Sequence, residues 1–318
     1  MRMPKYLSPT SIQLWYKDRE EFFRKYLAEN RQPRMPQTEP MSVGSAFDAY
    51  IKNYLASCLG MEEAKGELEL EKLLIEQVEP QNHDFAFEAG RKCFEAYKSL
   101  GATGYLMKEL EGAAEKPCFE YTVQATLTDT ETSMGVPLLG KPDLYFYTKS
   151  GKLCIYDWKV NGYCSKSGAS PKKGHLRCLT SGKPSSAHKL VTPMVVDGIS
   201  IDIANPLHAM DESWATQLAI YGWVLGGLDA KIIAGIDQLA CGPKGIRVAS
   251  MRNKLDPAWL AELWCKCVEI WSAIQEGAIF AENNEQKQLE LEDEAGAFVE
   301  DGDDNEKWYT SIMRSHKW

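Results

Sequence analysis

Hydrophobic and polar positions follow a helical period in the first third of the chain. Apolar residues recur at helical spacing from Ile12 to Leu27, after Ser8, a good N-cap, and Pro9, which suits the first helical position. A second amphipathic helix is expected around Gly44, a glycine that would let this helix approach another backbone closely. Residues 61–110 are rich in Glu, Lys, Leu and Ala and predict two or three further helices, a helical insertion without chemistry of its own.

The pattern then changes to runs rich in β-branched and aromatic residues, which predict strands. Asp211 or Ser213 is expected to cap a helix among them, and Pro257 to start the last long helix. This order of elements predicts an α/β protein. The expected strands are 118–127, Val136 to Tyr147, Leu153 to Val160, Lys231 to Ala240 and Gly245 to Met251.

The stretch from Gly140 to Lys159, GKPDLYFYTKSGKLCIYDWK, carries the candidate chemistry. Its two apolar runs around a Lys-Ser-Gly-Lys turn predict a β-hairpin. Side chains alternate along a strand, so Asp157 and Lys159 share a face, and the hairpin can bring Asp143 beside them. Such charges are costly to bury unless compensated, and carboxylate oxygens suit Mg²⁺ or Mn²⁺. Taken alone, the stretch also fits an ordinary hairpin with an Asp–Lys pair on its solvent face.

Composition restricts the class of protein. The chain has 318 residues, of which 44% are hydrophobic, enough for one large or two small domains. We expect no signal peptide, and no apolar run reaches about 18 residues, so no membrane association is expected. Its nine irregularly spaced cysteines are typical of reduced thiols, and we expect a cytoplasmic location. The Cys265–Cys267 pair alone is too weak a signal for zinc or an iron–sulfur cluster.

Charge is distributed unevenly. The net charge is −9, but residues 282–306 hold eleven acidic residues and one lysine, so the rest of the chain is close to neutral. We interpret residues 281–318 as an acidic tail. Between Val160 and Val196 there are six basic residues and no acidic residue. We therefore expect a basic loop that contacts the phosphate backbone of DNA and is mobile when DNA is absent. A solvated loop is the alternative, although it would normally carry both signs. The loop's cations are Lys166, Lys172, Lys173, Arg177, Lys183 and Lys189.

Five motifs occur in one order: an S-P-T-S helix, a G-S-A-F-D helix, a G-K-P-D strand, a D-W-K strand and a Q-x-x-x-Y helix. This order resembles the PD-(D/E)XK nuclease superfamily over roughly residues 5 to 275, and it is most similar to the RecB-like exonuclease branch, which includes phage exonucleases. The resemblance implies a restriction-endonuclease-like core, a central mixed β-sheet flanked by helices, in residues 1–280. Residues 61–110 and 160–210 would then be insertions, and 281–318 the tail.

The resemblance also assigns roles. Asp143 and Asp157 match the metal-binding acids, Lys159 the catalytic lysine, and the carbonyl of Trp158 would be a further ligand. Asp48 stands one turn after Gly44, where the branch usually has a metal-binding histidine. The alternative is a plain surface aspartate. The Q-x-x-x-Y motif, which contacts DNA in the family, corresponds to Gln217 and Tyr221.

These assignments imply a Mg²⁺-dependent deoxyribonuclease that hydrolyses phosphodiester bonds with Mg-activated water. An oxygen ligand at Asp48 favours Mg²⁺ over Mn²⁺, and the cysteine pattern of iron–sulfur relatives is absent, so no cluster is expected. Exonuclease action, a role in phage or bacterial recombination and repair, and a recombinase or single-strand-binding protein as partner follow from the branch alone. The alternative is a catalytically silent DNA-binding or interaction protein that keeps the nuclease fold.

Overall fold

The computed structural model describes residues 1–31, 33–119, 121–180 and 193–280. The chain divides into two units, Met1–Trp271 and Ser272–Trp318. The tail expected at 281–318 and the loop cations Lys183 and Lys189 lie outside the described residues. In the described ranges, no helix is both long and apolar enough to cross a membrane.

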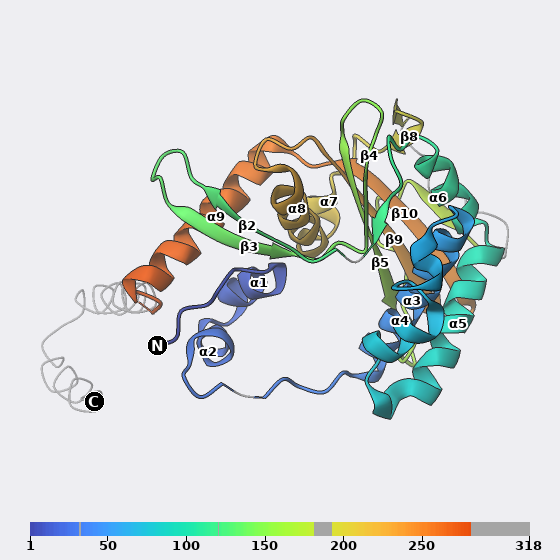
Figure 1. Ribbon diagram of the computed structural model, residues 1–318, viewed down its shortest axis with the longest axis horizontal. Coiled ribbons are helices and arrows are strands. Elements are labelled where there is room, and N and C mark those ends of the chain that lie inside the picture. The colour runs from blue at the N-terminus through green and yellow to red at the C-terminus, as the bar shows by residue number, and fades with distance from the viewer. Residues whose placement is uncertain (32, 120, 181–192, 281–318) are drawn as a thin grey trace, which may run out of the picture. The chain divides into compact units, whose positions relative to one another are not determined.

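A six-stranded mixed sheet forms the centre of the first unit, which confirms the α/β prediction (Figure 1). Strands β5 and β9 are parallel neighbours in its middle, and the other neighbouring pairs are antiparallel. A parallel pair needs a crossover connection, and the connection from β5 to β9 contains helix α8 (Glu212–Gly226). In spatial order the strands are β1 (Cys118–Phe119), β4 (Leu144–Tyr147), β5 (Leu153–Asn161), β9 (Ile232–Gly242), β10 (Gly245–Lys254) and β6 (Arg177–Leu179).

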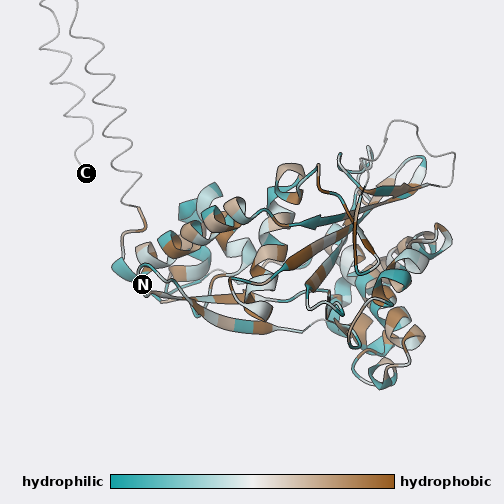
Figure 2. Cartoon of the chain, turned by 90° about the horizontal axis from the view of Figure 1, so that it is seen from above, coloured by the Kyte–Doolittle hydropathy of each residue, from teal (hydrophilic) through white to brown (hydrophobic). Residues whose placement is uncertain are grey.

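Helices cover both faces of this sheet. One face packs against α3 (Glu39–Cys58), α5 (His83–Ser99) and α6 (Ala102–Leu110), whose apolar residues share a core with β4, β5 and β9. The other face packs against α8. Figure 2 shows hydrophobic stretches on the central strands between the two groups of helices. The fold therefore buries the middle strands on both sides, as expected of a sheet covered by helices.

The remaining elements are shorter or lie at the edges. Two small sheets each pair two neighbouring strands, β2 with β3 and β7 with β8. Their bounds are β2 (Val123–Thr128), β3 (Gly135–Gly140), β7 (Met194–Val196) and β8 (Ile199–Ile201). The other helices are α1 (Pro9–Lys17), α2 (Arg19–Phe22), η1 (Phe23–Leu27), η2 (Glu62–Lys65), α4 (Leu70–Gln77), η3 (Pro80–Asn82), α7 (Leu207–Met210) and α9 (Pro257–Glu276).

Local sequence signals are confirmed at several boundaries. Ser8 forms a capping box with Ser11 at the start of α1, and Pro9 follows at the first helical position. Asp211, rather than Ser213, caps α8 by accepting a hydrogen bond from the backbone N–H of Trp214. The hairpin around the Lys-Ser-Gly-Lys turn and the β9–β10 hairpin both form.

The strand expected from Val136 to Tyr147 is wrong as a single element. It forms β3 and β4, which belong to different sheets and are separated at Lys141, Pro142 and Asp143. Pro142 has no N–H to donate to a ladder, so the break falls where pairing would fail. The run 118–127 divides in the same way into β1 and β2.

Both predicted insertions are more closely integrated than expected. Helices α5 and α6, from the segment 61–110, supply part of the main core instead of a separate subdomain. The segment 160–210 is not one long loop, because β6 forms an edge of the central sheet and β7 pairs with β8. These strands have three residues each, too few to produce a readable hydrophobic period.

The close helix approach predicted at Gly44 occurs instead at Gly90. A Cβ added at Gly44 would meet nothing within 4 Å, so this glycine is not needed for packing. A Cβ at Gly90 on α5 would lie 2.5 Å from the Cβ of Ala46 and 2.7 Å from the backbone nitrogen of Phe47. The missing side chain at Gly90 therefore sets how closely α5 packs on α3.

This contrast predicts opposite effects of the same substitution. Gly90→Ala should destabilise the protein by about 1–3 kcal/mol, because backbone atoms must move to admit the methyl group. Gly44→Ala should stabilise it by about 0.5–1 kcal/mol through helix propensity. Urea unfolding of both variants measures the difference, and equal effects would mean that the α3–α5 contact is wrongly placed.

Candidate active site

The register of the β4–β5 hairpin places Asp143 opposite Asp157. Leu144 pairs with Tyr156, and Asp143 stands one residue before this pair. The ladder ends there, so the backbone N–H of Trp158 is free to donate to Oδ2 of Asp143 at 3.1 Å. The break after β3 thus puts the first predicted acid at the mouth of the hairpin, against the strand that carries the second.

Asp157 and Lys159 share the face of β5 that α8 covers. Asp157 is only 2% exposed, and Nζ of Lys159 lies 2.5 Å from its Oδ2. Gln217 on α8 donates from Nε2 to Oδ1 of Asp157 at 3.0 Å and accepts from Nζ of Lys159 at 2.7 Å. The same amide nitrogen of Gln217 donates to the hydroxyl of Tyr221 at 2.8 Å. The structure therefore brings the D-x-K and Q-x-x-x-Y residues into one hydrogen-bonded cluster.

The electrostatics of this cluster are dominated by burial and by two neighbouring carboxyl groups. Burial, and then the charge of Asp143, raise the pKa of Asp157 to about 7, while Lys159 acts in the opposite direction. Burial lowers the pKa of Lys159, but Asp157 and Asp143 reverse this, and its pKa lies above the usual value. Burial and the nearby Asp157 also raise the pKa of Tyr221. The site therefore has more negative charge than Lys159 alone neutralises.

The donor set fits a hard divalent cation. In a strand, the N–H and C=O groups of one residue point to the same edge, so the Trp158 carbonyl faces the side on which its N–H meets Asp143. Two carboxylates and this carbonyl would then present oxygen ligands, which Mg²⁺ and Mn²⁺ prefer, with waters and substrate completing the shell. The raised pKa of Asp157 is the physical sign that a cation would be stabilising here.

Asp48 has a partner on its own helix. It lies on α3, and its carboxylate forms an ion pair with Lys52, one turn later and fully buried. The buried ammonium supplies the positive charge that Asp48 needs, so this acid is compensated without a metal. Among the described residues, no three or more His, Cys, Asp and Glu side chains gather as a metal-binding group. Asp48 as a metal ligand stays a prediction.

A pocket of about 330 Å³ opens beside Lys159. Gln217 and Tyr221 line it, together with Lys141 and with residues of α1, including Thr10 and Gln13. Helix α1 is held there because Gln13 donates to the backbone carbonyl of Ser213 at 3.1 Å. Sequence analysis gave the S-P-T-S helix no chemical role, and Lys141 of the G-K-P-D motif was passed over. The sequence did hold a signal for Lys141, because this lysine stands only two residues before Asp143, a predicted metal ligand.

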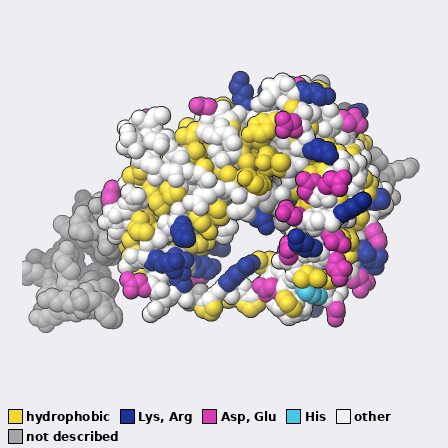
Figure 3. All heavy atoms as spheres, viewed as in Figure 1, with side chains coloured by type: hydrophobic (Ala, Val, Ile, Leu, Met, Phe, Trp, Pro, Cys, Tyr) yellow, Lys and Arg dark blue, Asp and Glu magenta, His cyan; other side chains and the backbone are white. Residues whose placement is uncertain are grey.

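The molecule also has an opening beside helix α1, whose residues line part of this pocket. Figure 3 shows an opening through the face seen there, between the part that holds α1 and α2 and the part that holds α3 to α5. In Figure 1 the chain between α2 and α3 runs along the lower side of this opening, and strand β5 ends at Asn161. Lys159, two residues before the end of β5, lies at that end of the strand.

The predicted basic residues differ in their surroundings. Lys166 and Lys173 are exposed. Lys172 is also exposed, but its Nζ pairs with Asp211, the cap of α8, at 3.0 Å. Arg177 lies on β6 with its guanidinium 3.6 Å from the ring centre of Tyr105. The structure therefore leaves Lys166 and Lys173 as the simplest candidates for backbone contacts.

The described part of the basic loop is fixed by hydrogen bonds, in contrast to the expected mobility. The backbone N–H of Ala169 donates to the Cys241 carbonyl at 2.7 Å, and that of Lys172 donates to Gln238 at 2.8 Å. Gly168 has φ of +67°, and a Cβ there would lie 2.7 Å from the same Cys241 carbonyl. The loop is thus held against the carboxyl end of β9.

A buried ion network that sequence analysis missed lies on the opposite face of the sheet. Arg252 donates to Glu109 at 2.8 Å and to Asp237 at 2.9 Å, and all three side chains are buried. The Tyr97 hydroxyl donates to the other oxygen of Asp237 at 2.5 Å. Asp237 pairs with Trp158 in the parallel ladder, so the network supports the strand segment behind the candidate site.

No protein-family model matches the chain, and no curated protein matches it either. Among solved structures, the chain is similar to one titled "Crystal structure of SSO0001". The sequences are 14% identical, and the match covers 82% of this chain and 86% of that chain with a TM-score of 0.25. At that TM-score the likeness carries no argument about function.

The charges of the site predict a measurable titration in the absence of metal. Because the pKa of Asp157 is raised above its unfolded value of about 3.9, the folded state binds more protons between about pH 4 and 7. Stability should therefore fall as pH rises through that window. Carbon NMR of the Asp157 carboxyl group in EDTA should give a pKa near 7, lowered in Asp143→Asn and raised in Lys159→Gln.

The exposed Lys166→Gln substitution is the matched control, and it should leave the titration of Asp157 unchanged. A pKa near 4 in the wild-type protein, or no response to Asp143→Asn, would contradict the arrangement of the two carboxyl groups.

Proposed function

We propose that the protein is a metal-dependent deoxyribonuclease with a restriction-endonuclease-like core. The observation that carries the proposal is the meeting of Asp143, Asp157, Lys159 and Gln217 at the mouth of the β4–β5 hairpin. The order strand, D-W-K strand, Q-x-x-x-Y helix and strand, on which the resemblance rests, also supports the proposal, because β4, β5, α8 and β9 follow it.

Each side chain has a role that its contacts support. Mg²⁺ bound by Asp143, Asp157 and the Trp158 carbonyl would supply an activated water and stabilise charge on the phosphate. Lys159 stays protonated beside the carboxylates and can donate to a phosphate oxygen as negative charge develops. Gln217 holds Lys159 and Asp157 in one geometry through its two amide atoms. Tyr221, which lines the pocket, can contact the nucleotide there.

Exonuclease action is the more specific part of the proposal. It is supported by the resemblance to the RecB-like branch, which includes phage exonucleases. Recombination and repair, with a recombinase or a single-strand-binding protein as partner, remain analogies from the branch.

One observation favours a catalytically silent DNA-binding protein instead. Asp48 is paired with Lys52, so the third expected ligand is occupied by a lysine of the same helix. A site with only two carboxylates could hold a cation too weakly for turnover. Metal binding and cleavage therefore have to be measured separately.

The proposal predicts distinct effects of three substitutions at the site. Asp143→Asn and Asp157→Asn should each lower Mg²⁺-dependent cleavage by at least about 10²-fold, because each removes a charged oxygen ligand. Lys159→Gln should bind Mg²⁺ in calorimetry and still lose turnover. Asp84→Asn, at an exposed acid on α5, is the matched control and should cleave normally.

The form of the DNA substrate distinguishes an exonuclease, an endonuclease and a catalytically silent DNA-binding protein. End-labelled linear single-stranded and duplex DNA should be degraded, whereas closed circles of the same sequence should survive. Cleavage of circles would make the protein an endonuclease. Retained DNA binding without Mg²⁺-dependent cleavage of any of these substrates would favour the silent protein.

The exposed lysines of the loop predict a change in salt dependence. Lys166→Ala with Lys173→Ala should weaken binding to all sequences alike and lower the slope of log K against log salt by about 0.9 for each lost contact with duplex phosphate. Adding Lys172→Ala and Arg177→Ala should weaken binding further, at some cost in stability, since both side chains have partners in the protein. Single-turnover cleavage at saturating enzyme should change much less.

Lys65→Ala with Lys72→Ala removes the same charge from exposed positions on the helical side of the protein and serves as the control. If both double variants flatten the salt slope equally, the effect is one of net charge and the loop is not the contact surface.

A further inference from the structure

A second pocket, of about 490 Å³, lies at the other end of the central strands. It is enclosed by the starts of β5 and β9, the end of β10, the turn after α8 and the first turns of α9. Lys152, at its edge, stands seven residues before Lys159 along β5, which corresponds to about 23 Å. The pocket is therefore separate from the candidate active site.

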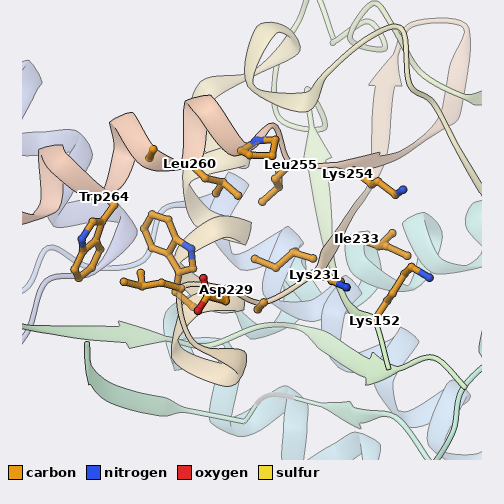
Figure 4. A pocket seen from close by; sticks show the side chains of 14 residues that line it. Lys152, Asp229, Lys231, Ile233, Lys254, Leu255, Leu260 and Trp264 are labelled. Atoms are coloured by element: carbon orange, nitrogen blue, oxygen red, sulfur yellow. The ribbon is translucent and has the colours of Figure 1, made fainter. Parts of the chain in front are cut away.

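Its lining combines an apolar floor with a cationic end. Most of the lining residues are apolar, among them Trp223, Leu255, Leu260 and Trp264. Figure 4 shows Lys152, Lys231 and Lys254 gathered at one end of the pocket and Trp264 at the other, with Leu255 and Leu260 between them. Asp229 is the single acid in the lining, so the pocket carries an excess of positive charge.

Two of the three lysines are available to a ligand. Lys231 and Lys254 are exposed, and within the described parts of the chain neither makes an ion pair. Lys152 already donates to Ser150 at 2.8 Å and lies 4.0 Å from Asp197. The backbones of β9 and β10 hold Lys231 and Lys254 side by side, because Lys254 pairs with Ile233, two residues after Lys231. This spacing suits one or two carboxylates.

We propose that this pocket docks an acidic segment of a partner protein that carries a large aliphatic or aromatic side chain. The apolar side chain would fill the trough between Trp223 and Leu260, and neighbouring carboxylates would meet Lys231 and Lys254. Charge complementarity selects an acidic partner, and an apolar anchor in a pocket beside aromatic residues is the usual source of interface energy. A nucleic-acid backbone would satisfy the lysines but would leave the apolar floor uncovered.

The proposal does not rest on nuclease activity, and its test reads binding alone. An array of fluorescein-labelled nonapeptides, in which acidic residues flank one Phe, Leu or Trp, is titrated against the full chain in EDTA by fluorescence anisotropy. The same array is repeated with the apolar residue replaced by Ser, and with the acids replaced by Asn. A single-stranded oligonucleotide is added as a competitor.

The expected result is binding by acidic peptides that keep the apolar residue, weakened about tenfold or more by Lys231→Glu with Lys254→Glu. Leu260→Asp should weaken it similarly, because it places a charge in the apolar trough. Lys65→Glu with Lys72→Glu makes the same change of net charge elsewhere and should bind normally. DNA cleavage and the Asp157 titration should be unchanged in all these variants.

Three results would overturn the proposal. Failure of every peptide in the array to bind would do so, as would equal binding by the Ser-substituted peptides, since the apolar floor would then play no part. Displacement of bound peptide by the oligonucleotide, together with loss of oligonucleotide binding in Lys231→Glu with Lys254→Glu, would make the pocket a nucleic-acid contact.

Discussion

The structure depends most on the register that sets Asp143 against Asp157 at the end of a short hairpin. Two carboxyl groups meet where burial already disfavours charge, and Lys159 with Gln217 offsets only part of the cost. A slip of one residue in the β4–β5 pairing would move Asp157 to the opposite face of the sheet, among the apolar residues of α3 and α5. The five-residue connection between β4 and β5 and the proline break before Asp143 fix that register from both ends.

The opposite face of the same strands shows how this arrangement is supported. Arg252 joins β10 to Asp237 on β9 and to Glu109 on α6, in a position with almost no solvent access. Removing one member of such a buried set leaves an uncompensated charge, which typically costs about 3–5 kcal/mol. The network therefore locks β9 to its neighbours directly behind Trp158. Rigid strands on this side allow the carboxylates on the other side to hold a fixed geometry.

Sequence predicted the parts of this architecture that depend on neighbouring residues. Ser8 and Pro9 at a helix start, and the turn between β4 and β5, are decided within a few positions. Periodicity alone placed Asp157 with Lys159 on one face of a strand and Gln217 with Tyr221 on one face of a helix. That these two pairs meet was implied only by the resemblance to the nuclease superfamily. The Arg252 network could not be predicted this way, since Glu109 and Asp237 come from elements more than a hundred residues apart in the chain. The Asp48–Lys52 pair had a local signal, the i,i+4 spacing, but the resemblance to the nuclease branch assigned Asp48 to the metal instead.

The central strands carry different chemistry at their two ends, and this limits how the ends could influence each other. The carboxylates lie at the carboxyl end of β5, and the lysine-rimmed pocket lies at its start. Between them run buried strands that the parallel β5–β9 ladder holds in one register. Coupling between sites requires an element with two states that both ligands bias. A segment docked at the start of β5 would therefore act by holding the protein close to its partner, and the geometry at Asp143 and Asp157 would stay as it is.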